Sequence, residues 1–161
     1  MKKISYLFVF LILLTNISSC AGYKPIFGSS NLEFKIADYI ITGDSKLGNQ
    51  IYSRLYNLSK ANKNNTGAEN IYISINVTKD KKSTAKNTEG KVLGYKINLT
   101  TTIIVRNFIT DKQILNENFS SSSSYKVQNK YSDTIKLEQK AVNNLINKTY
   151  QDFLIKLSEN I

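Results

Sequence analysis

Residues 71–78, IYISINVT, decide the fold, because aliphatic residues alternate there without interruption with polar or aromatic ones. A period of two places every aliphatic side chain on the same face, so this stretch predicts a β-strand with one buried face. A second alternating run, YKINLTTTIIV at residues 95–105, follows a basic, turn-rich segment at residues 79–90. Together the two runs predict an antiparallel pair of strands joined at that segment.

Two further strands flank this pair in the sequence. Residues 32–36 alternate apolar and charged side chains, and residues 115–119 open a strand that we expect to run to about Val127. Residues 110–112, Thr-Asp-Lys, predict the hairpin turn before this last strand. Its five consecutive serines, residues 120–124, are compatible with a flexible linker or with the solvated end of an edge strand.

Two helices are predicted between and after the strands. The first begins near Lys46, with Asp44 or Ser45 as its N-cap, and the second begins at Ser132 or Asp133 and runs to the C-terminus. Apolar residues recur at helical spacing in both: Leu47, Ile51, Leu55 and Leu58 in the first, and Leu137, Ala141, Leu145, Thr149, Phe153 and Leu157 in the second, beside Val142, Ile146, Tyr150 and Leu154.

The element order is therefore β-α-β-β-β-α. We expect residues 31–161 to form one α+β domain, a two-layer sandwich in which both helices pack on one face of the sheet. The sheet is expected to be an antiparallel meander plus the N-terminal strand, and the apolar stripes are expected to form its core.

The N-terminal segment has the pattern of an export signal. Lys2 and Lys3 precede an apolar run at residues 4–14, which is too short to cross a hydrocarbon core of ~30 Å as a helix. Ile17-Ser18-Ser19-Cys20 follows and resembles a lipobox, so we predict a lipoprotein signal peptide at residues 1–19 and a lipidated linker at residues 20–30. The alternative is an ordinary signal peptide whose cleavage site contains a cysteine.

Cys20 is the only cysteine of the chain, so an intramolecular disulfide is impossible and lipid attachment explains the thiol. We expect it to carry a covalent diacylglyceryl group and an N-acyl chain such as palmitate, as in Gram-negative bacteria. Two or more acyl chains anchor a protein stably without a transmembrane helix. By resemblance to enterobacterial sorting rules, Ala21 in place of an aspartate favours sorting to the outer membrane, on its periplasmic side.

The composition argues against an enzyme. Histidine is absent, the acidic residues are scattered singly, and neither a glycine-rich phosphate loop nor a nucleophile elbow occurs. We therefore expect no catalytic residues, no metal site and no cofactor beyond the lipid on Cys20. The net charge of +10 is compatible with an anionic lipid surface or with an AT-rich genome that favours lysine; nucleic acid is not expected as a partner of an exported lipoprotein.

Residues 20–28, Cys-Ala-Gly-Tyr-Lys-Pro-Ile-Phe-Gly, resemble the start of alphaproteobacterial LptE lipoproteins. The Gly94-Tyr95 pair before the long strand, the element order and the closing Ala-x-x-x-Leu helix are also similar to that family. The inserted Ala21 departs from the family pattern by one position. The resemblance implies an outer-membrane lipoprotein that plugs the LptD β-barrel, assists its assembly and helps deliver lipopolysaccharide to the outer leaflet.

The resemblance also implies that lysines contact the phosphates of lipopolysaccharide. The basic position of the family hairpin falls near Lys86, and a second family lysine falls near Lys130, in the loop before the last helix. The candidate lipopolysaccharide-binding residues are Lys79, Lys81, Lys82, Lys86, Lys91 and Lys130. The alternative is a solvated hairpin whose lysines reflect codon bias.

A second function is compatible with the same features. Periplasm-facing auxiliary lipoproteins of lipid-transport ABC systems also join a lipobox to a small α/β domain. Such a protein would bind a substrate or an inner-membrane partner rather than fill a barrel.

Overall fold

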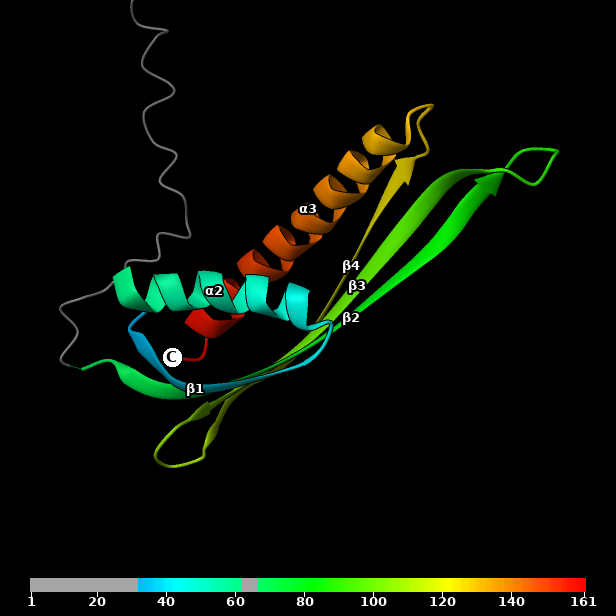
Figure 1. Ribbon diagram of the computed structural model, residues 1–161. Helices are drawn as coiled ribbons and strands as arrows, with labels where there is room; N and C mark the ends of the chain where they lie inside the picture. Colours follow the sequence, from blue (N-terminus) through cyan, green and yellow to red (C-terminus); the bar gives the residue numbers. More distant parts are fainter. Residues whose placement is uncertain (1–31, 62–66) are drawn as a thin grey trace, which may run out of the picture.

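The computed structural model describes residues 32–61 and 67–161 (Figure 1). The signal peptide, Cys20 and the linker predicted before residue 31 lie outside the described residues. The α+β class and the predicted order are confirmed. The elements are β1 (Phe34–Gly43), α2 (Ser45–Ala61), β2 (Glu69–Lys86), β3 (Val92–Asn107), β4 (Gln113–Lys126) and α3 (Tyr131–Ser158).

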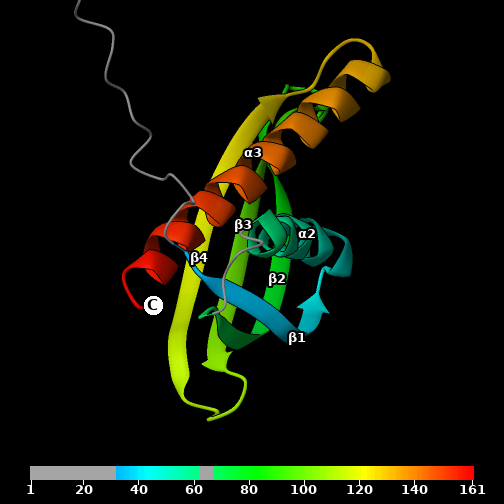
Figure 2. The ribbon, with the colours of Figure 1, turned by 90° about the vertical axis from the view of Figure 1, so that its left-hand side faces the viewer.

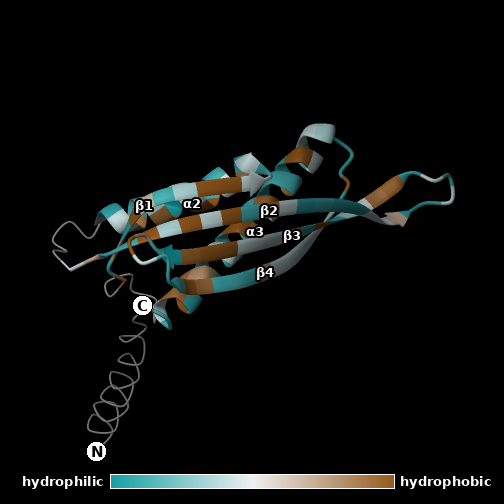
Figure 3. Ribbon diagram, turned by 90° about the horizontal axis from the view of Figure 1, so that it is seen from below, coloured by the Kyte–Doolittle hydropathy of each residue, from teal (hydrophilic) through white to brown (hydrophobic). Residues whose placement is uncertain are grey.

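The four strands form one open sheet in the order β1-β2-β3-β4. β1 runs parallel to β2, whereas β2, β3 and β4 form the predicted antiparallel meander. Both helices pack on the same face, α2 over β1 and β2 and α3 over β4 and β3 (Figure 2). The opposite face, which we call the uncovered face, carries no helix in the described part of the chain (Figure 3).

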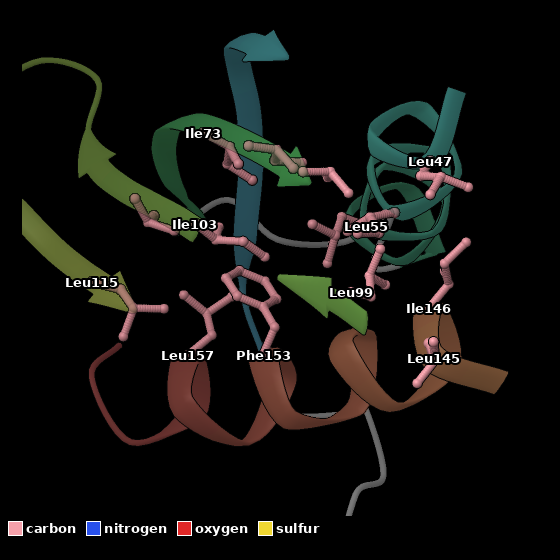
Figure 4. Close-up of a cluster of buried hydrophobic side chains, with 14 of the residues drawn as sticks. Leu47, Leu55, Ile73, Leu99, Ile103, Leu115, Leu145, Ile146, Phe153 and Leu157 are labelled. Atoms are coloured by element: carbon pink, nitrogen blue, oxygen red, sulfur yellow. The ribbon is translucent and has the colours of Figure 1, made fainter. Parts of the chain in front are cut away.

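The core lies between the sheet and the helices. The aliphatic residues of the 71–77 alternation are fully buried beneath α2, together with Leu47, Ile51 and Leu55 of that helix. Ile146, Phe153 and Leu157 of α3 close the other half of the core (Figure 4). The apolar stripes predicted from periodicity are thus core, and burial of each such side chain contributes roughly 1.5–3 kcal/mol.

β2 is longer than predicted. Residues 79–86 are not turn-rich but continue the strand, because they remain paired with β3 as far as the Lys86–Val92 pair. The turn is confined to residues 87–91. There the Asn87 side chain accepts hydrogen bonds from the backbone N–H groups of Glu89 (3.1 Å) and Lys91 (2.8 Å), and Gly90 adopts a positive φ of 83°.

The two helix starts differ from each other. Asp44 is the N-cap of α2, since its Oδ1 accepts the backbone N–H of Leu47 at 3.1 Å. In contrast, α3 begins one residue before Ser132, and its N-cap is Lys130, which makes no side-chain capping bond. The prediction of Ser132 or Asp133 as N-cap is therefore wrong. The serine tract belongs to β4, which confirms the edge-strand alternative.

Candidate functional site

Lysines from three parts of the chain gather at one end of the molecule. The β2–β3 turn, the end of β4 and the start of α3 meet there, at the upper right of Figure 1. The backbone N–H of Val127 donates to the carbonyl of Leu93, and Gly94 pairs with Lys126. We call this region the basic end; it contains Lys81, Lys82, Lys86, Lys91, Lys96, Lys126 and Lys130.

Lys81 lies on the helix-covered face and is fixed by contacts within the domain. Its Nζ is 2.6 Å from Glu138 Oε2 of α3 and 4.3 Å from the ring centroid of Tyr95. The hydroxyl of Tyr125 donates to the same carboxylate oxygen at 2.8 Å. These four side chains, which we call the latch, tie β2, β3 and β4 to the first half of α3.

The latch changes the protonation equilibria of its members. Burial works against the charge of Lys81, but the hydrogen bonds to Glu138 and Tyr125 outweigh it and raise the lysine pKa above its ordinary value. For Glu138, burial favours the neutral acid, yet the bonds from Lys81 and Tyr125 keep its pKa below the ordinary range. Burial raises the pKa of the Tyr125 hydroxyl. At neutral pH the latch therefore holds a charged lysine and a charged carboxylate.

Lys79 lines an open groove of about 400 Å³ between α2 and α3. Leu47 and Val142 give it apolar walls, and Gln50 and Asn143 contribute side-chain amides. Lys46 and the carboxylates of Asp44 and Glu138 also line the groove. Both carboxylates are held by the fold, since Asp44 caps α2 and Glu138 contacts Lys81. The groove can accommodate a small amphipathic group.

The uncovered face carries a row of lysines across three strands. Lys82 on β2 pairs with Lys96 on β3, and Lys126 on β4 lies two positions further along the sheet. Asp80 is 3.0 Å from Lys82, and this hydrogen bond lowers the pKa of the Asp80 carboxyl. Like charges in directly opposed positions are unfavourable. An anion bound across this row would relieve that repulsion.

The remaining predicted lysines surround the tip of the same end. Lys86 and Lys91 flank the β2–β3 turn, and Lys130 supplies the carbonyl that caps the first turn of α3. All three side chains are exposed. The structure thus brings five of the six predicted lysines to one end, whereas Lys79 lies opposite Leu99 in the middle of the sheet. It also separates Lys79 and Lys81, on the covered face, from Lys82 on the uncovered one.

Sequence reasoning missed Lys96 and Lys126. Lys96 enters the site through the long pairing of β2 with β3, and Lys126 enters it through the pairing of β3 with β4. The alternation in residues 95–105 places Lys96 opposite the core face, which was the one available signal. Nothing in the local sequence indicates that Lys126 ends beside Gly94.

Other kinds of site were sought in the described part of the chain. Residues 32–61 and 67–161 contain no group of three acidic side chains placed to hold a metal ion. Neither α2 nor α3 combines the length and apolar composition that crossing a bilayer requires.

The fold is that of several bacterial lipoproteins of known structure. Rare lipoprotein B from Shewanella oneidensis superposes with a TM-score of 0.52 at 11% identity, over 76% of this chain and 94% of that one. Minor lipoprotein from Acinetobacter baumannii gives 0.52 at 14% identity, over 79% and 94%. A putative lipoprotein from Caulobacter crescentus gives 0.52 at 8% identity, over 76% and 88%.

At these identities the likeness shows a shared fold and no more. No protein-family model and no curated protein sequence matches the chain.

Proposed function

We propose that this chain is an outer-membrane lipoprotein of the LptE type, anchored on the periplasmic side through acylated Cys20. In this proposal it occupies the lumen of the LptD β-barrel, assists assembly of that barrel and helps pass lipopolysaccharide to the outer leaflet. It acts by binding, without catalysis and without a cofactor other than its own lipid.

The observation that carries the proposal is the fold. A β-α-β-β-β-α sandwich shared with bacterial lipoproteins occurs here in a chain that also has a lipobox and the LptE-like stretch at residues 20–28. The fold and the N-terminal motif are separate observations, because the motif at residues 20–28 precedes β1, which begins at Phe34. Their agreement supports the lipoprotein class, and the motif supports the LptE type within it.

The two faces of the sheet support a plug. The uncovered face of β3 and β4 presents Asn98, Thr100 and Thr102 beside Ser120 and Ser122. Short polar side chains of this kind suit the polar lumen of an outer-membrane barrel, where hydrogen bonds rather than apolar burial hold a partner. The basic end offers cations to the phosphates of lipopolysaccharide.

The decisive experiment is affinity purification of the tagged full-length protein from outer membranes in mild detergent. We expect a large β-barrel protein to co-purify in stoichiometric amount. The control is Cys20→Ser, which cannot be acylated and is expected to be lost from the membrane fraction. Purification without any barrel contradicts the plug. Co-purification with inner-membrane permease components supports the ABC-system lipoprotein instead.

A further inference from the structure

The β3–β4 turn exposes two large apolar side chains next to each other. Phe108 is 52% exposed and Ile109 is 80% exposed, whereas most large apolar residues of the described chain lie in the core. Two adjacent exposed side chains of this kind, at the end of a hairpin, offer a small apolar surface for contact with something outside the domain.

Hydrogen bonds hold the turn in the conformation that exposes the pair. The side-chain carbonyl of Asn107 accepts the backbone N–H groups of Ile109 (2.9 Å) and Thr110 (2.8 Å). The Asn107 amide donates to Glu69 Oε1 at 2.6 Å, and Arg106 is 3.3 Å from Asp111 across the turn. Because these bonds fix the backbone, Phe108 and Ile109 cannot fold back onto the sheet without breaking them.

The turn lies at the end of the sheet from which the N-terminal linker departs. The backbone N–H of Phe108 donates to the carbonyl of Asn70 at 2.8 Å, and Asn70 pairs with Lys35 near the start of β1. Adjacent strands are ~4.8 Å apart, so the turn is within roughly 10 Å of the first residues of β1. In Figure 1 the start of β1, the C-terminus and this turn share the lower left of the molecule.

The number of residues between Cys20 and β1 limits how far the end of the sheet with the β3–β4 turn can lie from the lipid anchor. Leu32 follows Cys20 by twelve residues, and a chain of that length spans at most about 43 Å. β3 alone rises roughly 50 Å between Asn107 and Val92, at ~3.3 Å per residue. An anchor at Cys20 therefore allows the Phe108 turn to reach the lipid surface, with the basic end a full strand length away from it.

From this geometry we infer that Phe108 and Ile109 insert into the interfacial region of the lipid leaflet that holds the Cys20 anchor. The inference rests on the lipid anchor of the proposed function. The turn acts as a second, weaker attachment that sets the orientation of the domain, with its basic end directed away from the leaflet. Lys112 follows the apolar pair and can contact lipid phosphates from the rim of the turn.

A lipid surface fits this pair better than a protein does. A specific protein interface buries about 800 Å² per partner, with a complementary surface around its apolar centre. Phe108 and Ile109 form a narrow tip whose neighbours, Arg106, Asp111 and Lys112, are charged. An interfacial lipid layer accepts a small apolar tip with a charged rim without any matching shape.

The chain contains no tryptophan, so a single introduced tryptophan reports on one position alone. We would prepare full-length acylated protein as Phe108→Trp and reconstitute it in vesicles of phosphatidylethanolamine and phosphatidylglycerol with acyl-brominated lipid. Leu93→Trp is the matched control, because Leu93 is 47% exposed but lies at the basic end. We expect a blue shift and at least threefold stronger bromine quenching for the Phe108 variant.

A second variant separates insertion from folding. Phe108→Ser with Ile109→Ser leaves every turn hydrogen bond to Asn107 available, because those bonds use backbone N–H groups. With a tryptophan reporter at Thr110, this variant should keep its circular dichroism spectrum and lose most of the quenching seen for Thr110→Trp alone.

The outcomes distinguish the inference from the proposed function. Vesicle-bound protein with equal quenching at positions 108 and 93 overturns the insertion and leaves the anchor in place. Protein that stays off the vesicles overturns the anchor, and the insertion with it. A third outcome is a blue shift of the Phe108→Trp fluorescence that appears only with the co-purified barrel and without bromine quenching. It would assign the tip to a protein contact and overturn the lipid assignment.

Discussion

At the scale of single residues, Lys81 differs from the other lysines of the basic end. Its contacts with Glu138 and the ring of Tyr95 place it inside the domain, whereas Lys82, the next residue, points to the uncovered face and pairs with exposed Asp80. Two lysines that are equivalent in sequence thus have different surroundings, and the alternation of a strand is the reason.

A pair of double-mutant cycles tests this difference. We expect Lys81→Met and Glu138→Gln to show a coupling energy of roughly 1 kcal/mol in the free energy of unfolding, because the pair is partly shielded from water and shares a hydrogen bond with Tyr125. The matched cycle of Lys82→Met and Asp80→Asn should show a clearly smaller coupling energy, because water screens this exposed pair. Urea titrations measure both. Equal couplings in the two cycles would contradict the assignment of the latch.

The pH dependence of the latch has a definite sign. The folded state lowers the pKa of Glu138 below its ordinary value of 4.5, so this carboxylate stabilises the fold above that pH. The contribution is lost as the pH falls through the lower folded value. We expect the unfolding free energy of the parent protein to fall more steeply below about pH 4.5 than that of Glu138→Gln, measured by urea titration at a series of pH values.

At the scale of elements, alternation and helical periodicity predicted every strand and helix but not all of their ends. The 71–77 run ends where its aliphatic residues end, and the following KDKKSTAK has no alternation to read. Only pairing with β3 keeps residues 79–86 extended, and pairing is a property of two distant segments. The end of β2 was therefore beyond any local reading of the chain.

The helix starts show the same limit. Asp44 caps α2 because Gly43, with a φ of 74°, turns the chain sharply out of β1 and places the aspartate before the first turn. Ser132 and Asp133 have suitable side chains for a cap, but the chain enters α3 from Lys130, where the end of β4 delivers it. The position of the preceding strand overrides the preference of the side chain.

These observations predict different costs for two similar substitutions. Asp44→Ala should reduce the unfolding free energy by about 1 kcal/mol, because the backbone N–H of Leu47 loses its acceptor. Ser132→Ala, at the position that local sequence favours as a cap, should leave it within about 0.5 kcal/mol of the parent. Thermal unfolding followed by circular dichroism compares the two. A larger loss for Ser132→Ala would mean that α3 starts later than residue 131.

At the scale of the whole molecule, the candidate site depends on the fold more than on any motif. The lysines of residues 79–91 are adjacent in sequence and were predicted as a group, and Lys130 was added by resemblance to LptE. Lys96 and Lys126 join them only through the registers of β2 with β3 and of β3 with β4. The fold adds an asymmetric distribution of charge, because it places these lysines at the opposite end of the sheet from the start of β1.

This asymmetric distribution of charge leads to a prediction about lipopolysaccharide binding. Replacing Lys82, Lys96 and Lys126 with serine removes the row on the uncovered face, and we expect the affinity for lipopolysaccharide to fall about tenfold at low salt, or roughly 1.4 kcal/mol. The control replaces Lys35, Lys60 and Lys156, which lie at the opposite end of the molecule, and changes the net charge by the same amount. The difference between the triple variants should shrink at 1 M salt, where the Debye length is only ~3 Å. Binding to immobilised lipopolysaccharide is measured for both triple variants at low salt and at 1 M salt. Equal weakening by the two triple variants would mean that net charge, and not the position of the basic end, determines the affinity.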